Sequence, residues 1–198
     1  GEPGVPPGPA DSYLAYGPQW AQASNTPFRR YKQYTYEGGI STPLVVTWPG
    51  VMQASGGLTN QVGHVIDLMP TCLDLAGVSY PASFKGRAMP PVEGKSLIPI
   101  LQGQERAPHD VLYWEHTGHR AVREGDWKLV AERGSSDWEL YNIREDRTEL
   151  HDLSKEKPEM TLRLRGIWES WAEDVGIVPW EEITRIRQER RRAVSERN

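Results

Sequence analysis

The chain has 198 residues, which is enough for one domain with a substantial core or for part of a larger one. Its 23 Lys and Arg against 27 Asp and Glu give a net charge of −4 with both signs interspersed, which argues against a nucleic-acid partner. The single cysteine excludes an internal disulfide, no run approaches the roughly 18 apolar residues of a membrane span, and no signal segment opens the sequence.

The first sixty residues are predicted to be mostly loop around one strand. Gly1–Gly8 holds three prolines and three glycines and is typical of a flexible loop. Asp11–Trp20 is rich in turn residues and is expected to dock against the body of the protein. Leu44–Trp48 is an apolar, β-branched run, which predicts a strand buried on both faces. Met52–Gly63 is polar and contains glycine, which indicates a loop.

The next segment is predicted to be helical in two places. Asp67 is a candidate N-cap for a nearly all-apolar helix at Leu68–Ala76, and such a helix is expected to be buried. Cys72 lies within it and is interpreted as a buried thiol without a catalytic role. Tyr80–Val92 is proline-rich and irregular, and a short helix is expected at Leu97–Leu101.

The remainder of the chain predicts a small antiparallel sheet followed by a helix. The candidate strands are Val111–Trp114, Arg120–Arg123, Trp127–Ala131 and Trp138–Tyr141, with a hairpin turn at Glu124–Asp126. Pro158 opens a helix that ends at Gly176. Its apolar residues recur at helical spacing, so one face is expected to lie on the sheet: Met160, Leu164, Ile167, Trp168, Trp171 and Val175. Residues 181–198 carry six arginines and four glutamates and are interpreted as a solvated, charged tail.

The segment Asn25–Gly50 places cations and aromatic residues beside the glycine pair Gly38–Gly39, which allows positive φ or a close approach of two backbones. Its elements Asn-Thr-Pro-Phe-Arg, Tyr-Lys, Tyr-Glu-Gly-Gly-Ile, Thr-Pro-Leu and Trp-Pro-Gly resemble, in this order, the second half of a type I sulfatase of the alkaline-phosphatase-like superfamily. The similarity spans most of the chain, from about Gly17 to Trp180. It continues through Gly63–Thr71, Glu93–Leu97, Trp114–His116, Arg120–Arg123, Gly125–Val130 and Trp138–Tyr141.

The resemblance implies an α/β fold, namely the C-terminal part of an alkaline-phosphatase-like sulfatase with a small antiparallel sheet packed by a C-terminal helix. Residues 1–104 would be the end of the catalytic α/β domain. Residues 105–180 would be the sheet-and-helix subdomain, and residues 181–198 the charged tail. The family also suggests a periplasmic or secreted location.

The resemblance assigns a catalytic role to Lys32. In this family the lysine before the Glu-Gly-Gly element contacts the sulfate ester, and Lys32 matches it. A fixed ammonium near the bridging oxygen stabilises the charge that develops as the S–O bond breaks.

Other polar residues near the motifs are candidates for binding or for structure. His116 and His119 follow a predicted strand and are candidates for hydrogen bonds to the substrate. His64 is interpreted as a structural histidine. Arg29 and Arg30 could add to an anionic cleft, although one of them is expected to pair with an acid such as Glu37.

The family's nucleophile and metal ligands have no counterpart in this sequence. The nucleophile is a formylglycine made from a Cys/Ser-x-Pro-x-Arg stretch, and Cys72 is followed instead by Leu-Asp-Leu-Ala. The family binds calcium through an Asp-Asp pair and an Asp-Asn-Gly element, and neither occurs here. Calcium is therefore expected in the full-length protein, with ligands that are not in this chain.

Three functions remain open on the sequence. The first is the C-terminal part of a sulfuric ester hydrolase acting on an aryl or carbohydrate sulfate, and this chain alone would then be inactive. The second is a phosphate or phosphonate ester hydrolase of the same superfamily. The third is a non-catalytic domain that binds sulfated glycans. The missing nucleophile and metal set would discriminate among them.

Overall fold

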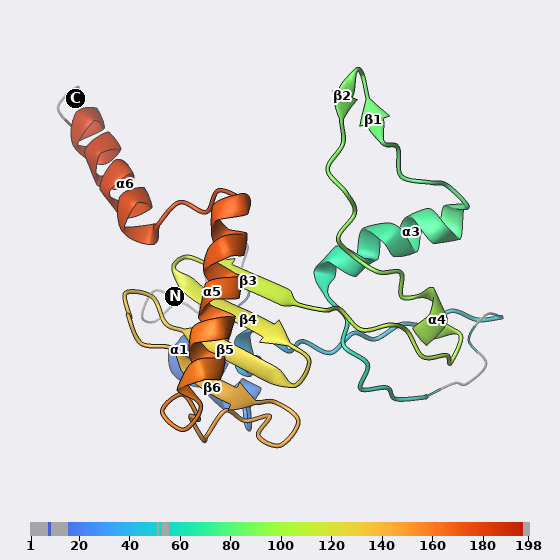
Figure 1. Cartoon of the computed structure of the whole chain (residues 1–198), viewed down its shortest axis with the longest axis horizontal. Helices are drawn as coiled ribbons and strands as arrows, with labels where there is room; N and C mark the ends of the chain where they lie inside the picture. The colour runs from blue at the N-terminus through green and yellow to red at the C-terminus, as the bar shows by residue number, and fades with distance from the viewer. Residues whose placement is uncertain (1–7, 9–15, 51, 53–55, 196–198) are drawn as a thin grey trace. The chain divides into compact units, whose positions relative to one another are not determined.

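The computed structural model describes residues 8, 16–50, 52 and 56–195. They form two compact units, one from Gly1–Pro43 with Val111–Asn198 and the other from Leu44–Asp110. Figure 1 shows the chain, whose elements are α1 Pro18–Asn25, α2 Glu37–Ile40, the 3-10 helix η1 Val65–Asp67, α3 Leu68–Ala76, β1 Ser83–Phe84, β2 Arg87–Ala88, α4 Ile98–Leu101, β3 Leu112–His116, β4 His119–Glu124, β5 Trp127–Ala131, β6 Glu139–Asn142, α5 Pro158–Asp174 and α6 Trp180–Ser195. The loop predicted at Gly1–Gly8 and the first half of Asp11–Trp20 lie largely outside the described residues.

The first unit is built on the antiparallel sheet that the sequence predicts. Its strands run in the order β3-β4-β5-β6. Glu124 pairs with Trp127, so β4 and β5 form a hairpin whose turn is Gly125–Asp126. Gly125 has φ 58°, a left-handed conformation that glycine adopts without a steric penalty. The predicted hairpin and all four strands are confirmed, with ends that shift by one or two residues.

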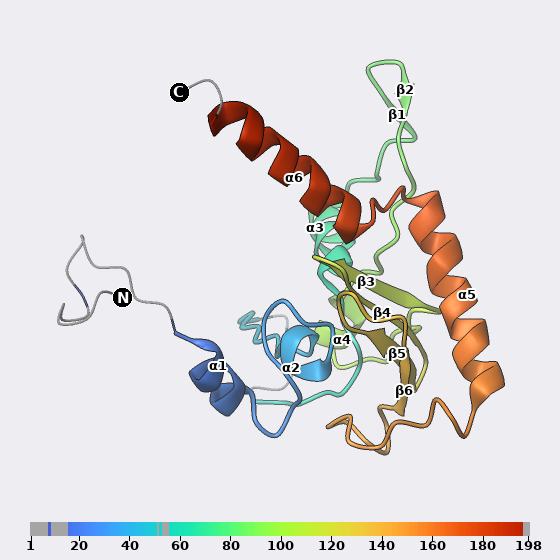
Figure 2. The same ribbon diagram turned by 90° about the vertical axis from the view of Figure 1, so that its left-hand side faces the viewer.

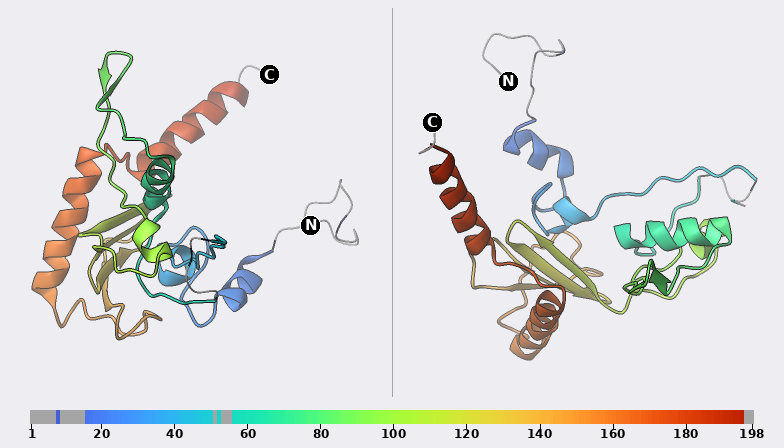
Figure 3. Two further views of the ribbon diagram at one scale, coloured as in Figure 1. Left: turned by 90° about the vertical axis from the view of Figure 1, so that its right-hand side faces the viewer. Right: turned by 90° about the horizontal axis from the view of Figure 1, so that it is seen from above.

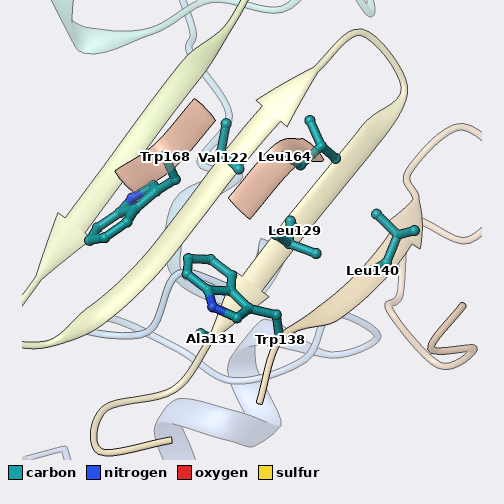
Figure 4. Close-up of a cluster of buried hydrophobic side chains, with 7 residues drawn as sticks. All are labelled: Val122, Leu129, Ala131, Trp138, Leu140, Leu164 and Trp168. Carbon is teal, nitrogen blue, oxygen red and sulfur yellow. The ribbon is translucent and has the colours of Figure 1, made fainter. Parts of the chain in front are cut away.

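One face of this sheet packs against α5. Figure 4 shows the cluster between them, which consists of Val122, Leu129, Ala131, Trp138, Leu140, Leu164 and Trp168. The indole Nε1 of Trp168 donates to the carbonyl oxygen of Trp114 at 3.1 Å, and the ring of Trp171 stacks on that of Tyr113 at 4.7 Å. The predicted helix and its buried face are confirmed, except that Val175 is 51% exposed.

The opposite face of the sheet is covered by the segment that runs from Phe28 to α2. Figures 2 and 3 show α2 and α5 on opposite sides of the strands. A second buried cluster fills the space beneath this segment: Tyr36, Ala121, Val130, Tyr141 and Ile143. The alternation along β4 and β5 explains the two clusters, because Ala121 and Val122 point to opposite faces.

The first unit also contains helices near both ends of the described chain. Helix α1 begins at Pro18 within a segment predicted to be turns. Residues 181–195, interpreted from the sequence as a charged tail that could be helical, continue helix α6, whose arginines are exposed. The helix begins at Trp180, whose ring contacts the guanidinium groups of Arg133 and Arg187, 4.8 and 5.3 Å from its centroid.

The second unit contains η1, α3, α4 and a short hairpin of β1 and β2. The sequence did not predict this hairpin. Helix α3 has the predicted bounds, and Gly77 ends it with φ 64°. The prediction that this helix is buried is wrong, because Leu75 is 52% exposed and Thr71 is the only buried residue on it. Cys72 is likewise exposed rather than buried. Both apolar clusters of the described residues belong to the first unit, so α3 has no comparable core to cover it.

The prediction of a strand at Leu44–Trp48 is also wrong. These residues have no regular secondary structure, and Val45 is 87% exposed. A strand needs a neighbour for its backbone N–H and C=O groups. The described strands pair only with one another, and although β3 and β6 each keep a free edge, neither pairs with this run.

Asp67 is the polar centre of the second unit. It stands at the N-cap position of α3, as the sequence suggests, but its side chain makes no cap hydrogen bond to that helix. Its carboxylate is fully buried and accepts from the backbone N–H groups of His64 and Lys95 at 2.8 Å each. It also pairs with Arg106 at 3.0 Å and with His109 Nε2 at 2.8 Å. The predicted structural role of His64 agrees with this, since its ring accepts from the N–H of Ile66.

The compact units do not follow the predicted division at residue 104, because residues 16–43 group with the sheet. That division concerns functional parts of a longer protein and stays a prediction. Among the helices of the described chain, none has the length and apolarity needed to cross a membrane.

Candidate active site

The candidate site is the turn that carries Lys32, and its shape follows from the two glycines of α2. A Cβ on Gly38 would lie 2.2 Å from the carbonyl oxygen of Arg30, and one on Gly39 would lie 2.0 Å from that of Tyr34. The N–H of Gly38 also donates to the Arg29 carbonyl at 3.0 Å. The glycine pair is therefore needed for the close backbone approach that the sequence suggested, so that the turn rests directly on α2.

Two arginines before the turn fasten it to the sheet. Arg29 Nη1 donates to Glu139 at 2.9 Å and to the Tyr141 hydroxyl at 2.7 Å. Arg30 donates to Glu132 Oε1 from Nε and Nη2, at 3.0 and 2.6 Å. The predicted pairing of one arginine with an acid is therefore met by these two glutamates, and the suggested partner Glu37 is engaged elsewhere.

Glu37 belongs to a buried ion triad with Lys128 and Glu149. The Lys128 ammonium lies 2.8 Å from a carboxylate oxygen of each glutamate, and all three side chains are buried. The backbone N–H of Glu37 donates to Glu149 at 2.7 Å. Burial alone raises the pKa of both glutamates. The ammonium outweighs burial at Glu37, whose pKa is lowered, whereas the pKa of Glu149 stays raised.

Lys32 itself projects from this anchored turn into solvent. It is exposed, and no hydrogen bond or ion pair holds its ammonium within the part of the chain that the structure describes. Arg30, two residues before Lys32, and Gln33, directly after it, have φ of 64° and 92°, so the turn is tight. Because Arg29 and Arg30 are neutralised by Glu139 and Glu132, Lys32 is the cation of this segment that remains available to an anion.

The two candidate histidines differ in their surroundings. They are cross-strand partners at the end of the β3–β4 hairpin. His116 is exposed, whereas His119 is 6% exposed, and its Nδ1 accepts from the N–H of Arg133 at 3.2 Å. Burial, and then the charge of Arg133, lower the pKa of His119 and favour its neutral form. Of the pair, His116 has the freer ring for a substrate contact.

The structure brings the Lys32 turn and this hairpin together through Tyr34. The Tyr34 ring packs on His119 with 4.6 Å between ring centroids. The guanidinium of Arg30 also lies over the Tyr34 ring, 4.9 Å from its centroid. Arg133 was not among the candidates drawn from the sequence; its Nη2 donates to Thr117 at 2.9 Å, beside the same histidine. A cation two residues after a predicted strand was the available signal for it.

Within the described ranges, no group of three or more His, Cys, Asp or Glu side chains is arranged to hold a metal ion.

Comparison with known proteins places the chain in a family. Residues 29–165 match the family described as N-sulphoglucosamine sulphohydrolase, C-terminal. A sulfatase of Schizosaccharomyces pombe without an assigned substrate is 32% identical over 174 residues, which cover 85% of this chain and 31% of that protein. The N-acetylgalactosamine-6-sulfatase of Canis lupus familiaris is 32% identical over 118 residues, which cover 60% of this chain and 21% of that protein.

Solved structures show the same fold. The crystal structure of Ps i-CgsB has a TM-score of 0.60 at 24% identity, over 74% of this chain and 32% of that one. The PsFucS1 sulfatase from Pseudoalteromonas sp. has a TM-score of 0.53 at 20% identity, over the same shares of the two chains. This chain thus spans less than a third of the length of these relatives. The chain belongs to the sulfatase family, and it corresponds to the C-terminal portion of a type I sulfatase.

Proposed function

We propose that this chain is the C-terminal part of a sulfuric ester hydrolase and supplies Lys32 to its active site. The nucleophile, a formylglycine, and the calcium ion would belong to the remainder of the protein. The observation that carries the proposal is the state of the cations in the matched segment. Arg29 and Arg30 are neutralised by glutamates, and Lys32 is left exposed on a turn anchored to a buried sheet.

Such a lysine has a defined chemical task. As the S–O bond of a sulfate ester breaks, negative charge moves onto the bridging oxygen. An ammonium held near that oxygen stabilises this transition state more than the ground state. A lysine is a compact point charge, and this suits a single oxygen better than the planar fork of an arginine does.

His116 is proposed to contact the substrate beside Lys32. Its ring is exposed at the end of β3, while the packing of Tyr34 on His119 brings the two loops together. Ps i-CgsB, which shares the fold, has been solved in complex with k-i-k-neocarrahexaose. A carbohydrate sulfate is therefore the substrate class that we propose for the whole protein.

The test is Lys32→Ala in the whole sulfatase that contains this chain. We expect kcat/KM to fall on the order of 10²-fold, the usual scale for losing one transition-state contact. Lys32→Arg should restore little of it. Lys155→Ala is the matched control. Lys155 is also exposed in this unit, and it lies outside the segment Asn25–Gly50 that carries the motif around Lys32.

Two results would contradict the proposal. Unchanged kinetics of Lys32→Ala would remove this residue from the active site. Turnover of an aryl sulfate by the purified 198-residue chain, surviving repurification, would show that the nucleophile does not lie elsewhere. A parent enzyme that hydrolyses phosphate esters faster than sulfate esters would favour the phosphate-hydrolase alternative.

A further inference from the structure

The buried triad of Lys128, Glu37 and Glu149 joins three separate segments at one point. Lys128 is the second residue of β5, Glu37 is the first residue of α2, and Glu149 follows β6. Each carboxylate is 2.8 Å from the ammonium, and Glu149 also accepts from the backbone N–H of Glu37 at 2.7 Å. Glu37 is therefore held both by its side chain and by its backbone.

The turn that delivers Glu149 is shaped for this contact. Glu149 has φ 57°, a left-handed conformation that a residue with a side chain rarely adopts. Asp146 fixes the surrounding backbone, because its Oδ2 accepts from the N–H groups of Leu150 and His151 at 2.8 Å each. The chain thus accepts an unfavourable backbone conformation in order to place this carboxylate in the interior.

Stability alone does not explain such an arrangement. Charges lose their hydration when they are buried, and replacing a buried ion triad with apolar residues of similar volume is often neutral or stabilising. The charges instead fix geometry, because an ammonium bound to two carboxylates sets the distances between the segments that carry them. Here the fixed segment is α2.

Helix α2 in turn carries the Lys32 turn. The backbone carbonyl oxygens of Arg30 and Tyr34 lie so close to Gly38 and Gly39 that neither glycine could bear a Cβ. A shift of Glu37 would therefore move the turn with it. A point charge must be placed within a fraction of an ångström to stabilise a transition state, and a displacement of about 1 Å can cost on the order of 10²-fold in rate.

We propose that Lys128, Glu37 and Glu149 are positioning residues for Lys32. They act through α2 and do not touch the substrate. The inference rests on the proposed function of Lys32, so its test must separate the two.

The test uses the whole sulfatase with a neutral triad, Glu37→Gln/Lys128→Met/Glu149→Gln. This variant leaves no unpaired charge in the interior, whereas Lys128→Met alone would bury two uncompensated carboxylates. Glu149→Gln alone is the second variant and replaces the neutral triad if that protein does not fold. The control is Leu164→Ala, which removes packing on the opposite face of the sheet without touching α2.

We expect the neutral triad to lower kcat about 10-fold or more at a temperature where circular dichroism shows every variant folded. Deuterium uptake should rise in peptides that cover residues 29–40. Leu164→Ala should lower the melting temperature but leave the kcat of the folded enzyme within about twofold of the parent. Adding Lys32→Ala to the neutral triad should cost much less than Lys32→Ala does alone, because the triad acts through Lys32.

The outcomes separate the two proposals. A folded neutral triad with parental kcat, in an enzyme where Lys32→Ala is strongly impaired, would overturn the positioning role. Fully additive losses from the two changes would overturn it as well. If Lys32→Ala is without effect, the proposed function fails, and raised uptake at residues 29–40 would then show that the triad still holds the turn.

Discussion

The buried charges of this chain form ion pairs between segments that are far apart in the sequence. Asp67 directly precedes a helix, which in sequence suggests a cap, yet its carboxylate binds Arg106 and the N–H of Lys95. Glu37, likewise, could be matched to a nearby arginine in sequence, whereas its partner is Lys128. Ion pairs between distant segments depend on the tertiary structure, and no local pattern encodes them. Lys32 is a candidate because a motif surrounds it in the sequence, and the structure adds that it is exposed.

Asp67 gives a prediction at this scale. Burial raises its pKa, but the N–H groups of Lys95 and His64 and the charge of Arg106 outweigh this, so the pKa is lowered. A lowered pKa in the folded state contributes stability above the unfolded value of about 3.9, and this stability is lost as the pH falls through the folded pKa. Asp67→Asn should therefore destabilise the second unit by roughly 3–5 kcal/mol at pH 7, because the buried Arg106 would lose its counter-charge and keep only the carbonyl oxygens of Val62 and Lys95 as acceptors.

The measurement is amide exchange of peptides covering residues 64–109, corrected for the intrinsic rate at each pH. The gap between parent and variant should narrow as the pH falls below about 4. Asp74→Asn is the control, since Asp74 is exposed on the same segment. A gap that does not change with pH would show that the Asp67 charge contributes nothing to the fold.

At the scale of elements, the predictions that were confirmed rest on interactions between residues close together in the sequence. The β4–β5 hairpin and α5 were predicted because alternation, a glycine turn and helical spacing are local signals. Leu44–Trp48 has the composition of a buried strand but lacks a neighbouring strand in the described chain. Helix α3 shows the same limit, because its bounds were correct and its burial was not. Composition predicts what a segment can become, whereas burial depends on what surrounds it.

Helix α5 offers a matched pair of substitutions. Leu164 is fully buried against the sheet, while Leu162, two residues earlier, is 66% exposed. Leu164→Ala should destabilise the first unit by roughly 2–5 kcal/mol through lost burial and a cavity. Leu162→Ala should change it by less than about 0.5 kcal/mol. Urea unfolding followed by tryptophan fluorescence measures both, and equal losses would mean that α5 does not pack by the face assigned to it.

At the scale of the whole molecule, the two units differ in how they bury apolar surface. The first unit has a cluster on each face of its sheet, and the segment from Phe28 to α2 forms one of its outer layers. The second unit is held chiefly by polar contacts around Asp67, and it exposes Leu44, Val45, Leu68, Met69 and Leu75. The chain spans less than a third of the length of the two curated relatives compared above.

This difference predicts uneven stability in the isolated chain. Each large apolar side chain left in water forgoes roughly 1.5–3 kcal/mol of stabilisation, and losing several exceeds what a small domain can spare. In hydrogen exchange on the 198-residue chain, β3–β6, α5 and residues 28–40 should be the slowest segments. Residues 44–50 should exchange at nearly the rate of an unfolded peptide, because their backbone is in no sheet or helix. Protection from exchange should thus drop within a few residues, between Ile40 and Leu44. Equal protection on both sides of that point would mean that Leu44–Trp48 is ordered by contacts other than those described, and the assignment of the two units would then be wrong.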